Sequence, residues 1–479
     1  MSRTPPTGPA PAPATRDQAD AYRFGLRRLE AALVRGDPVP LHEQVRSQRR
    51  AAVAGVVLGL LALGAVAGYA KIVPRPDWRA QSVVLGSASG ALYVVAGGER
   101  LVPVANLPAA RLVLAALRTG GATGADPATA APVVVADADL DTAPRTAAAD
   151  VAGAAAVRLD GAVVPPAWAV CDEAGERGPR TVVVGGAVPP AGSAGAALLA
   201  APDGGTWLVH EGRRHRVDPD DRPALLALGL TGQVPRAAST ALLDALAEAA
   251  PLRTPRVPGA GTRAPAGVPG AIGDVLVGEG VGGVRHWVVL AGGVQEVPDA
   301  LAGALRGAGA AAHEVGPDVL AAAREVPAGD PTALDATGWP SGAVPALGPA
   351  EAPVVCWTWS AGTDPAGSAL VAAGLPVPPG APVVPLAQDG GEAADAVVLA
   401  PAGGGAVRAT GPGRAPGAGP LWLVSATGTA YGVADDATAA ALGLTAAEPA
   451  PEAALRLLPV GGALDVHRAV RTVDVLPAG

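Results

Sequence analysis

The stretch AAVAGVVLGLLALGAVAGYA, residues 51–70, decides the architecture of this chain. It carries no charge, and a helix of about 20 residues rises about 30 Å, which matches the hydrocarbon thickness of a bilayer. A signal peptide and a buried helix of a soluble domain are the two alternatives. Both the apolar run and the region before it are longer than those of a signal peptide. The sequence therefore predicts one transmembrane helix.

Charge differs between the two sides of this stretch. Residues 1–50 hold nine Arg and five acidic residues, about +4, whereas the rest of the chain sums to about −12. Positive charge favours the cytoplasmic side, so we expect 1–50 inside the cell and 71–479 outside it. Beyond the span, Lys71, Arg75 and Trp78 are placed to anchor in the lipid headgroups. The net-acidic outer part argues against nucleic-acid binding.

The chain has only two cysteines, Cys171 and Cys356, and both lie in the predicted outer part. An even number of cysteines outside the cell suits one disulfide in an oxidising compartment. Two unrelated buried thiols are the alternative. We predict that the two cysteines pair, which agrees with the outer location of this part.

A second helix is predicted in the tail, at residues 16–35, where apolar residues recur at helical spacing until Gly36 and Pro38. Residues 1–14 are Pro-rich and are expected to be disordered. A lone helix of this length is marginal in water, so we expect it to dock on a partner or on an anionic membrane surface. The residues assigned to this contact are Tyr22, Leu26, Arg27, Arg28, Leu29 and Leu33.

The membrane stretch contains small residues at four-residue spacing. Gly55 with Gly59, and Gly64 with Gly68, each lie on one helix face, where they let another backbone approach. The two pairs fall on nearly opposite sides of the helix. An Ala/Gly-rich chain also produces such pairs by chance. The functional interpretation is a helix packed between neighbouring membrane helices.

Four outer segments, beginning at Ser89, Asp203, Gly283 and Gly419, resemble one another. Each has an aromatic residue, then Val or Leu, a Gly-bearing turn, a second short strand and an Ala/Leu-rich helix. The pattern predicts four hairpin-plus-helix repeats with irregular spacing. We interpret the aromatic residues as hairpin core rather than as a ligand platform. They are Tyr93, Trp207, Trp287 and Trp422.

Motifs for nucleotide or acyl chemistry are scarce. The sequence has no G-x-x-x-x-G-K-[ST] and no G-x-S-x-G. Gly278, Gly280 and Gly283 form a G-x-G-x-x-G, but a strand is predicted after it, so no helix N-terminus would face a phosphate. We therefore predict no catalytic residue and no cofactor.

Two further groups resemble sites but have simpler explanations. His210, Glu211 and His215 resemble a zinc motif, yet they are one residue too far apart and lie on a predicted hairpin, so we predict no metal site. Acidic residues just before the repeat helices are expected to cap them rather than to act in catalysis. These are Asp218, Asp220, Asp221, Asp435 and Asp436.

The tail RDQADAYRFGLRRLEAALVRGD, followed by one span, resembles EccB, a membrane component of type VII (ESX) secretion systems in high-GC Gram-positive bacteria. The segments SGALYVV, VPVANLPAARLVL, WAVCD, ALGL, GDVLVG and CWTW are similar to that family as well. The resemblance runs from about residue 15 to the end, and residues 144–159 and 467–472 depart from the family pattern. It implies an inner-membrane assembly with EccC, EccD and EccE that exports small helical proteins.

With this resemblance, the expected fold class is α+β. An N-terminal amphipathic helix and one transmembrane helix precede an extended extracytoplasmic domain of four hairpin-plus-helix repeats around a disulfide-bearing core. Gly/Pro/Ala-rich stretches near 254–270, 340–353 and 401–420 are expected to be linkers or long loops. The expected limits are 1–50 for the tail, 51–70 for the span, 71–120, 196–250, 251–325 and 396–446 for the repeats, and 121–195, 326–395 and 447–479 for the core.

Three functional hypotheses follow. The first is a structural subunit of a secretion complex, itself a homo-oligomer within the assembly. The second is an ATP hydrolase, because some members of the family carry that label. The third is a cell-wall-binding membrane protein, since Gly-turn hairpin repeats can bind glycans.

Overall fold

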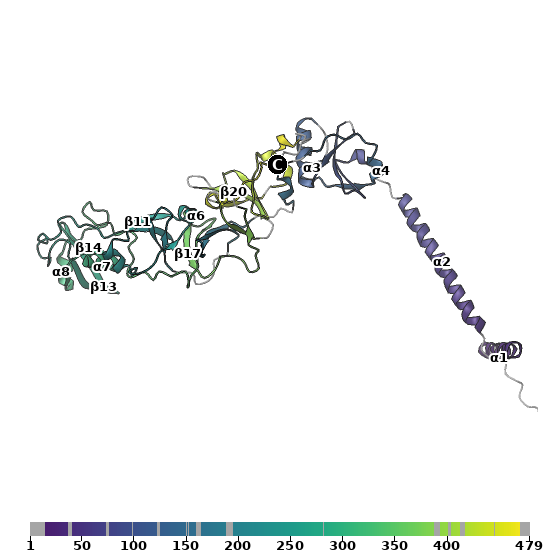
Figure 1. Ribbon diagram of the computed structural model, residues 1–479, viewed down its shortest axis with the longest axis horizontal. Coiled ribbons are helices and arrows are strands. Elements are labelled where there is room, and N and C mark those ends of the chain that lie inside the picture. The colour runs from purple at the N-terminus through teal and green to yellow at the C-terminus, as the bar shows by residue number, and fades with distance from the viewer. Residues whose placement is uncertain are drawn as a thin grey trace, which may run out of the picture. The chain divides into compact units, whose positions relative to one another are not determined.

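The structure is a computed structural model of the 479-residue chain (Figure 1). It falls into two units, residues 1–76 and 77–479, and each is treated by itself below. The described residues are 15–36, 41–72, 76–97, 99–121, 125–149, 151, 153–159, 164–187, 195–280, 282–387, 393–400, 404–411, 417–444 and 446–469. The predicted disorder of 1–14, and the expected roles of Pro38 and Arg75, lie outside them.

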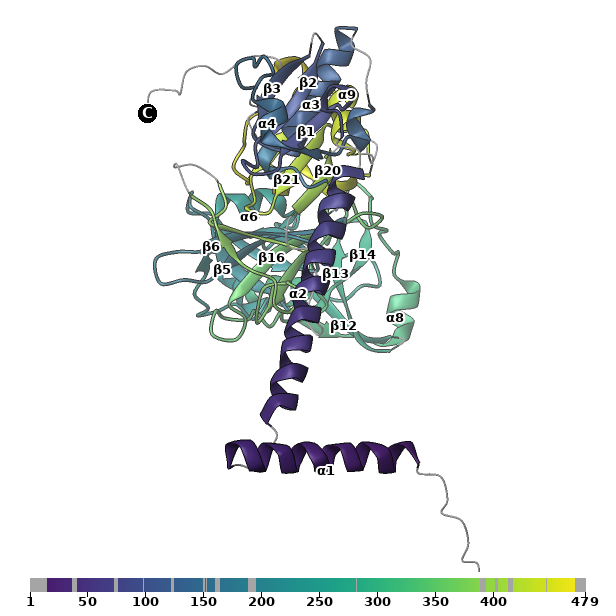
Figure 2. The ribbon, with the colours of Figure 1, turned by 90° about the vertical axis from the view of Figure 1, so that its right-hand side faces the viewer.

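The first unit consists of two helices, α1 (Arg16–Arg35) and α2 (Leu41–Ile72) (Figure 2). Thr15 caps α1 by accepting from the Gln18 N–H, and Gly36 ends the helix in a left-handed conformation. This matches the predicted helix at 16–35. Within α2, residues Ser47–Tyr69 are long and apolar enough to cross a membrane. The candidate span begins a few residues before the predicted one because the helix continues through the flanking Arg residues.

Four sheets in the described part of the second unit share one strand order. Three strands form an antiparallel meander, a helix follows, and a fourth strand pairs in parallel with the first. The helix supplies the crossover that a parallel return requires. We name these sheets and their helices modules 1 to 4. Module 1 contains β1 (Val83–Gly86), β2 (Leu92–Ala96), β3 (Arg100–Val104), α3 (Leu107–Thr119) and β4 (Val133–Val135).

The other three modules repeat this order of elements. Module 2 contains β7 (Ala197–Ala200), β8 (Thr206–His210), β9 (Arg213–Val217), α5 (Arg222–Ala227) and β10 (Arg236–Ala237). Module 3 contains β12 (Val275–Gly280), β13 (Gly283–Leu290), β14 (Gly293–Val297), α7 (Asp299–Gly307) and β15 (Ala312–Glu314). Module 4 contains β20 (Gly404–Thr410), β21 (Leu421–Ser425), β22 (Ala430–Gly432), α9 (Asp436–Leu442) and β23 (Glu448–Pro451).

A short helix and a closing segment complete each module. The closing segment pairs in parallel with the third strand: 145–149 with β3, β11 (Glu248–Leu252) with β9, Glu325 with Val294 of β14, and 460–464 with the region of β22. One edge of each sheet is therefore covered, which limits unwanted strand pairing. The short helices are α4 (Asp137–Leu140), α6 (Thr240–Ala245), α8 (Pro317–Ala322) and α10 (Glu452–Leu455).

The modules are larger than the predicted hairpin-plus-helix units. Each begins one strand before its aromatic residue and ends after a parallel strand. The expectation of a linker or long loop at 401–420 was wrong for residues 404–410, because β20 lies there. Gly404 adopts φ +70°, and a Cβ on it would lie 2.0 Å from the Val424 carbonyl, so glycine is needed there for close strand approach. The predicted domain limits stay a prediction, although β23 lies beyond the expected end of the fourth repeat.

A six-stranded central sheet has the order β17-β16-β5-β6-β19-β18. Its strands come from two separate parts of the chain, one between modules 1 and 2 and the other between modules 3 and 4. The antiparallel pairing of β5 with β16 joins the two parts. Its strands are β5 (Ala167–Glu173), β6 (Arg180–Gly185), β16 (Val354–Ser360), β17 (Ser368–Ala372), β18 (Val384–Pro385) and β19 (Ala396–Leu399).

The modules pack in two pairs. Module 1 shares a hydrophobic cluster with module 4, where α3 meets α9, and Figure 2 shows these two helices side by side. Module 2 shares a cluster with module 3, where α5 meets α7. The chain path is therefore nested: the inner pair is consecutive in sequence, and the outer pair joins its first and last modules.

Trp78 is not available as a membrane anchor. It lies in the short 3-10 helix η1 (Trp78–Ala80), is 2% exposed, and packs in module 1 with Val84, Tyr93 and Leu101. The Asp77 carboxylate accepts from the Arg79 N–H and so caps the start of η1. The expected headgroup contact of Trp78 was therefore wrong. Three further 3-10 helices are η2 (Pro127–Thr129), η3 (Ala154–Ala156) and η4 (Val466–Arg468).

Candidate functional site

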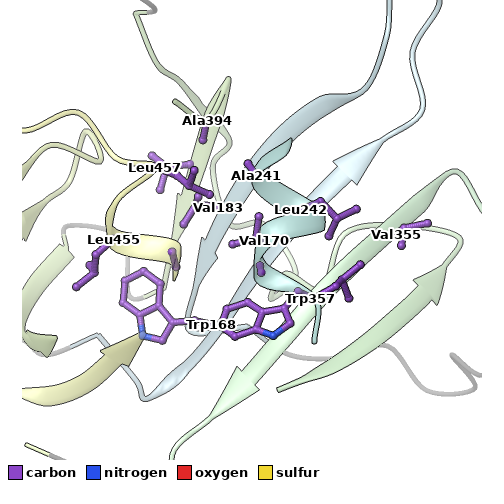
Figure 3. Close-up of a cluster of buried hydrophobic side chains, with 14 of the residues drawn as sticks. Trp168, Val170, Val183, Ala241, Leu242, Val355, Trp357, Ala394, Leu455 and Leu457 are labelled. Atoms are coloured by element: carbon purple, nitrogen blue, oxygen red, sulfur yellow. The ribbon is translucent and has the colours of Figure 1, made fainter. Parts of the chain in front are cut away.

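One face of the central sheet carries the main hydrophobic core (Figure 3). Trp168 on β5 is fully buried, and Trp357 on β16 is 3% exposed. α6 of module 2 covers this face with Leu242, and α10 of module 4 reaches it with Leu455. Each buried aliphatic side chain of this kind contributes roughly 1.5–3 kcal/mol. This face therefore holds one module of each pair on the central sheet.

The opposite face contains the disulfide. Cys171 on β5 lies directly across from Cys356 on β16, and the structure joins them as predicted. Both side chains are fully buried, in a cluster that includes Val182 and Val398. The bond crosses the seam between the two parts of the sheet. It therefore ties the first half of the second unit covalently to its second half.

A buried carboxylate connects module 2 to the central sheet. Asp172 on β5 is 5% exposed and accepts from the Ser239 N–H at 2.6 Å, from the Ser239 hydroxyl at 2.8 Å and from the Thr181 hydroxyl at 3.0 Å. Ser239 in turn caps α6 by accepting from the Leu242 N–H. Burial raises the pKa of Asp172 against these hydrogen bonds, and the nearby Asp395 carboxylate acts in the same direction.

A cavity of about 490 Å³ lies beside this carboxylate, with Thr181, Ser239 and Asp395 among its lining residues. The Asp395 carboxylate accepts from the Thr181 N–H at 2.7 Å. Most of the remaining lining is Ala and Pro. The arrangement is a hydrogen-bonded joint between α6 and β6 rather than a converging set of reactive groups.

A buried arginine makes a second connection. Arg236 on β10 is 9% exposed, and its guanidinium donates to the Ala352 and Leu347 carbonyls in the segment before β16. Burial lowers its pKa. Sequence reasoning missed both Asp172 and Arg236. The one available signal for Asp172 was its position next to Cys171 in the segment WAVCD, because polar residues are uncommon in a fully buried strand.

The four predicted aromatic residues occupy the second strand of each module. Tyr93 and Trp207 are each 8% exposed, and Trp287 and Trp422 are partly buried against neighbouring clusters. Arg214 stacks on Trp207 at 4.5 Å from the ring centre. Their assignment to the hairpin cores stays a prediction.

The predicted contact residues of α1 point into solvent within the first unit. Tyr22 is 69% exposed, Leu29 62% and Leu33 86%, and Leu26, Arg27 and Arg28 accompany them on the helix. The glycines of the span have open space around them as well. Apart from the adjacent residues and the backbone of the helix itself, no described atom lies within 4 Å of an ideal Cβ at Gly55, Gly59, Gly64 or Gly68.

The remaining motifs fall where the sequence placed them. Gly278, Gly280 and Gly283 lie in the β12–β13 hairpin, and His210 and His215 lie on β8 and β9. Within the described ranges, no three His, Cys, Asp or Glu side chains group closely enough to hold a metal ion.

Two of the acidic residues cap module helices. Asp221 accepts from the Ala224 N–H at 3.0 Å, and Asp435 accepts from the Thr438 N–H at 2.7 Å. The prediction of capping is therefore confirmed for these two.

Comparison with known families identifies the chain. The model described as "Type VII secretion system ESX-1, transport TM domain B" matches residues 12–478, nearly the whole sequence. The chain belongs to the EccB family. The resemblance stated from the tail and the WAVCD segment is confirmed over the full length.

Several curated relatives are similar over their whole length. The chain is 34% identical to the ESX-5 secretion system ATPase EccB5 of Mycobacterium tuberculosis, covering 97% of this chain and 94% of that protein. It is 32% identical to the ESX-3 secretion system ATPase EccB3 of Mycolicibacterium smegmatis, covering 96% and 92%. The word ATPase belongs to the names of those proteins.

Two solved structures show the same fold. A chain of the intact ESX-5 inner membrane complex has a TM-score of 0.68 and 31% identity, with 98% of each chain covered. The EccB3 dimer from the ESX-3 core complex has a TM-score of 0.66 and 29% identity, covering 81% of this chain and 99% of that one. The mixed α+β fold with one candidate membrane helix and a large domain of periplasmic type is thus a family property.

Proposed function

We propose that this chain is a structural subunit of a type VII (ESX) secretion complex in the inner membrane, where it supports export of small helical proteins. The match over 98% of both chains to a member of the intact ESX-5 complex carries this proposal. The described side chains do not argue for catalysis: the buried polar groups Asp172 and Arg236 are engaged in holding modules to the central sheet.

The membrane topology follows from charge. The basic tail with α1 lies in the cytoplasm, α2 crosses the membrane and the second unit lies outside. A disulfide in the second unit supports this orientation, since structural disulfides persist in oxidising compartments. Protease added to spheroplasts should digest the second unit and leave the tail intact.

The partners we propose are subunits of the EccC, EccD and EccE type together with further copies of this chain. The exposed apolar face of α1 and the glycine pairs of the span supply the contact surfaces. An apolar face of this kind is stable only when covered. The relative from the ESX-3 core complex is a dimer, which supports self-association here.

Purification of the tagged full chain from its native membrane in mild detergent tests the proposal. EccC-, EccD- and EccE-type chains should co-purify, and deletion of the gene should abolish export of the small helical substrates. Recovery of the chain with none of these subunits would contradict it.

The double substitution Gly55→Leu with Gly59→Leu tests the span. It should leave membrane insertion intact and lower recovery of partner chains, because interhelical packing contributes about 1–2 kcal/mol. Ala54→Leu with Ala65→Leu adds the same side chains on a side of the helix between the two glycine faces and serves as the control. Equal recovery from both variants would show that the glycine faces are not contact surfaces.

A further inference from the structure

The outer edge of the module 1 sheet differs from the equivalent edge of the other modules. Within the described residues, β4 is a terminal strand with no neighbour beyond it. It reads Val-Val-Val, without charge or proline, and Val134 is 56% exposed. An uncharged apolar edge strand is a template for pairing with another chain, and proteins usually block such edges.

The three equivalent edges are blocked in this way. β10 is only two residues long. β15 carries His313 and the exposed Glu314. β23 contains Pro449 and Pro451, which cannot donate a backbone hydrogen bond. Module 1 alone lacks such a feature among the four described edges.

The backbone of β4 is oriented for pairing. The Val135 carbonyl accepts from the Ser87 N–H at 2.9 Å, so the backbone groups of Val135 face β1. Since backbone groups alternate in direction along a strand, the N–H and carbonyl of Val134 face outward. The carbonyl of Pro132 and the N–H of Ala136 face the same way.

From this arrangement we propose that β4 pairs antiparallel with β4 of a second copy of the chain, in a register centred on Val134. Val134 of each copy then exchanges two hydrogen bonds with its equivalent, and each Ala136 N–H donates to the Pro132 carbonyl of the other copy. The groups left over need no partner: Pro132 has no N–H, and the Ala136 carbonyl already accepts from the Asp139 N–H at 3.0 Å.

A twofold axis brings the same edge of two copies together, so the backbone donors of each copy meet the acceptors of the other. A partner of different sequence would need an edge strand that matches these groups on its own. The inference rests on the self-association proposed above and adds where it occurs. Two module 1 sheets join into one continuous sheet across the axis. A short strand of this kind sets register, and other contacts supply the remainder of the affinity.

Cysteine cross-linking of the full chain in native membranes tests the register. Both natural cysteines are in the disulfide, so Val134→Cys introduces the sole thiol. A hydrogen-bonded antiparallel pair places its Cα atoms about 5.5 Å apart, within the roughly 4.4–6.8 Å of a disulfide. Mild oxidation should convert most of the variant into a band of twice the chain mass on a non-reducing gel.

Two controls separate this pairing from random collision. Ala138→Cys is exposed on the neighbouring α4 but out of register, and Val234→Cys is 86% exposed in module 2. Both should cross-link several-fold less. Equal cross-linking of Ala138→Cys and Val134→Cys, or a Val134→Cys adduct with a different protein, would overturn the proposal.

Co-purification of two differently tagged copies distinguishes the two possible failures. Association of wild-type copies without a Val134→Cys dimer would refute the β4 interface and leave the proposed function standing. No association of wild-type copies would refute the self-association itself. Val134→Lys should lower recovery of the second copy several-fold, because like charges then lie directly opposite each other.

Discussion

Each of the two module pairs brings two helices into contact, but the side chains at the two contacts differ. Between modules 2 and 3, α7 lies close to α5 through glycine: an ideal Cβ at Gly303 would be 3.2 Å from the Ala227 Cβ. Between modules 1 and 4, α3 and α9 meet through aliphatic side chains, including Leu112 and Leu442, which are 0% and 1% exposed. The α5–α7 contact therefore depends on a glycine, which has no side chain, and the α3–α9 contact depends on large aliphatic side chains.

The pairs also differ in distance along the chain. Modules 2 and 3 follow one another, and both lie inside the loop that Cys171 and Cys356 close, whose ends are 185 residues apart in sequence. Modules 1 and 4 lie outside this loop, and the disulfide shortens the chain path between them. Because the entropic cost of bringing two segments together grows with the chain between them, the disulfide favours the outer pair specifically.

Reducing the disulfide should have the largest effect on the difference between the two module pairs. In the chain-entropy model a loop of this size stabilises by about 5 kcal/mol, with smaller values usual in practice. Amide hydrogen exchange on oxidised and reduced protein should show greater loss of protection in α3 and α9 than in α5 and α7. Equal loss in both pairs would refute the idea that the bond serves mainly the outer pair.

The second largest effect is expected from removing side-chain atoms at the contact between modules 1 and 4. Leu442→Ala should lower the free energy of unfolding by about 2–5 kcal/mol, since it leaves a cavity in the shared cluster. Denaturant unfolding measures the change. Leu226→Ala on α5, where the side chain is 66% exposed, is the matched control and should change stability little.

Adding atoms to the inner pair should have a smaller effect. Gly303→Leu should cost about 1–3 kcal/mol through overpacking against Ala227. Arg306→Leu adds an apolar side chain on the exposed side of the same helix and provides the comparison. A Gly303→Leu variant as stable as the Arg306→Leu variant would show that the α5–α7 contact is not tightly packed.

An effect of similar size to that of Gly303→Leu is expected where the pairs attach to the central sheet. Module 2 uses the Asp172 carboxylate, whereas α10 of module 4 reaches the sheet through apolar residues such as Leu455. Asp172→Ala should cost about 1–3 kcal/mol, because it leaves the part-buried Ser239 N–H without its acceptor. Asp172→Asn retains an acceptor and should be close to neutral.

The pH dependence of Asp172→Asn has a defined sign. The pKa of Asp172 in the folded protein is raised above the ordinary value of 3.8 by burial. Its contribution to stability is therefore fully favourable below that ordinary value and is lost as pH rises through the raised pKa. Relative to wild type, Asp172→Asn should gain stability over this window. Unfolding midpoints that shift in parallel from pH 3.5 upward would contradict the assignment.

The sequence was most informative where one pattern has one physical solution. The uncharged 20-residue stretch, the helix at 16–35 with its Gly36 cap and the two cysteines were each interpreted correctly. The first strand of each module was missed because periodicity is weak in four to seven residues, and β20 resembled a linker through its glycines. The Asp172 joint was not predictable, since its partners Thr181 and Ser239 come together only when the sheet and module 2 dock.

The nested path has a consequence for the order in which the protein is made. A chain that emerges N-terminus first presents module 1 at once, yet the surface of α3 waits for α9, which lies near the other end of the sequence. Modules 2 and 3 close on each other long before that. A chain truncated before residue 436 would keep a complete middle and a bare apolar surface on its first module. Chaperones and quality-control proteases recognise exposed apolar surface of this kind. They would therefore act on a chain that lacks module 4 and spare the complete chain.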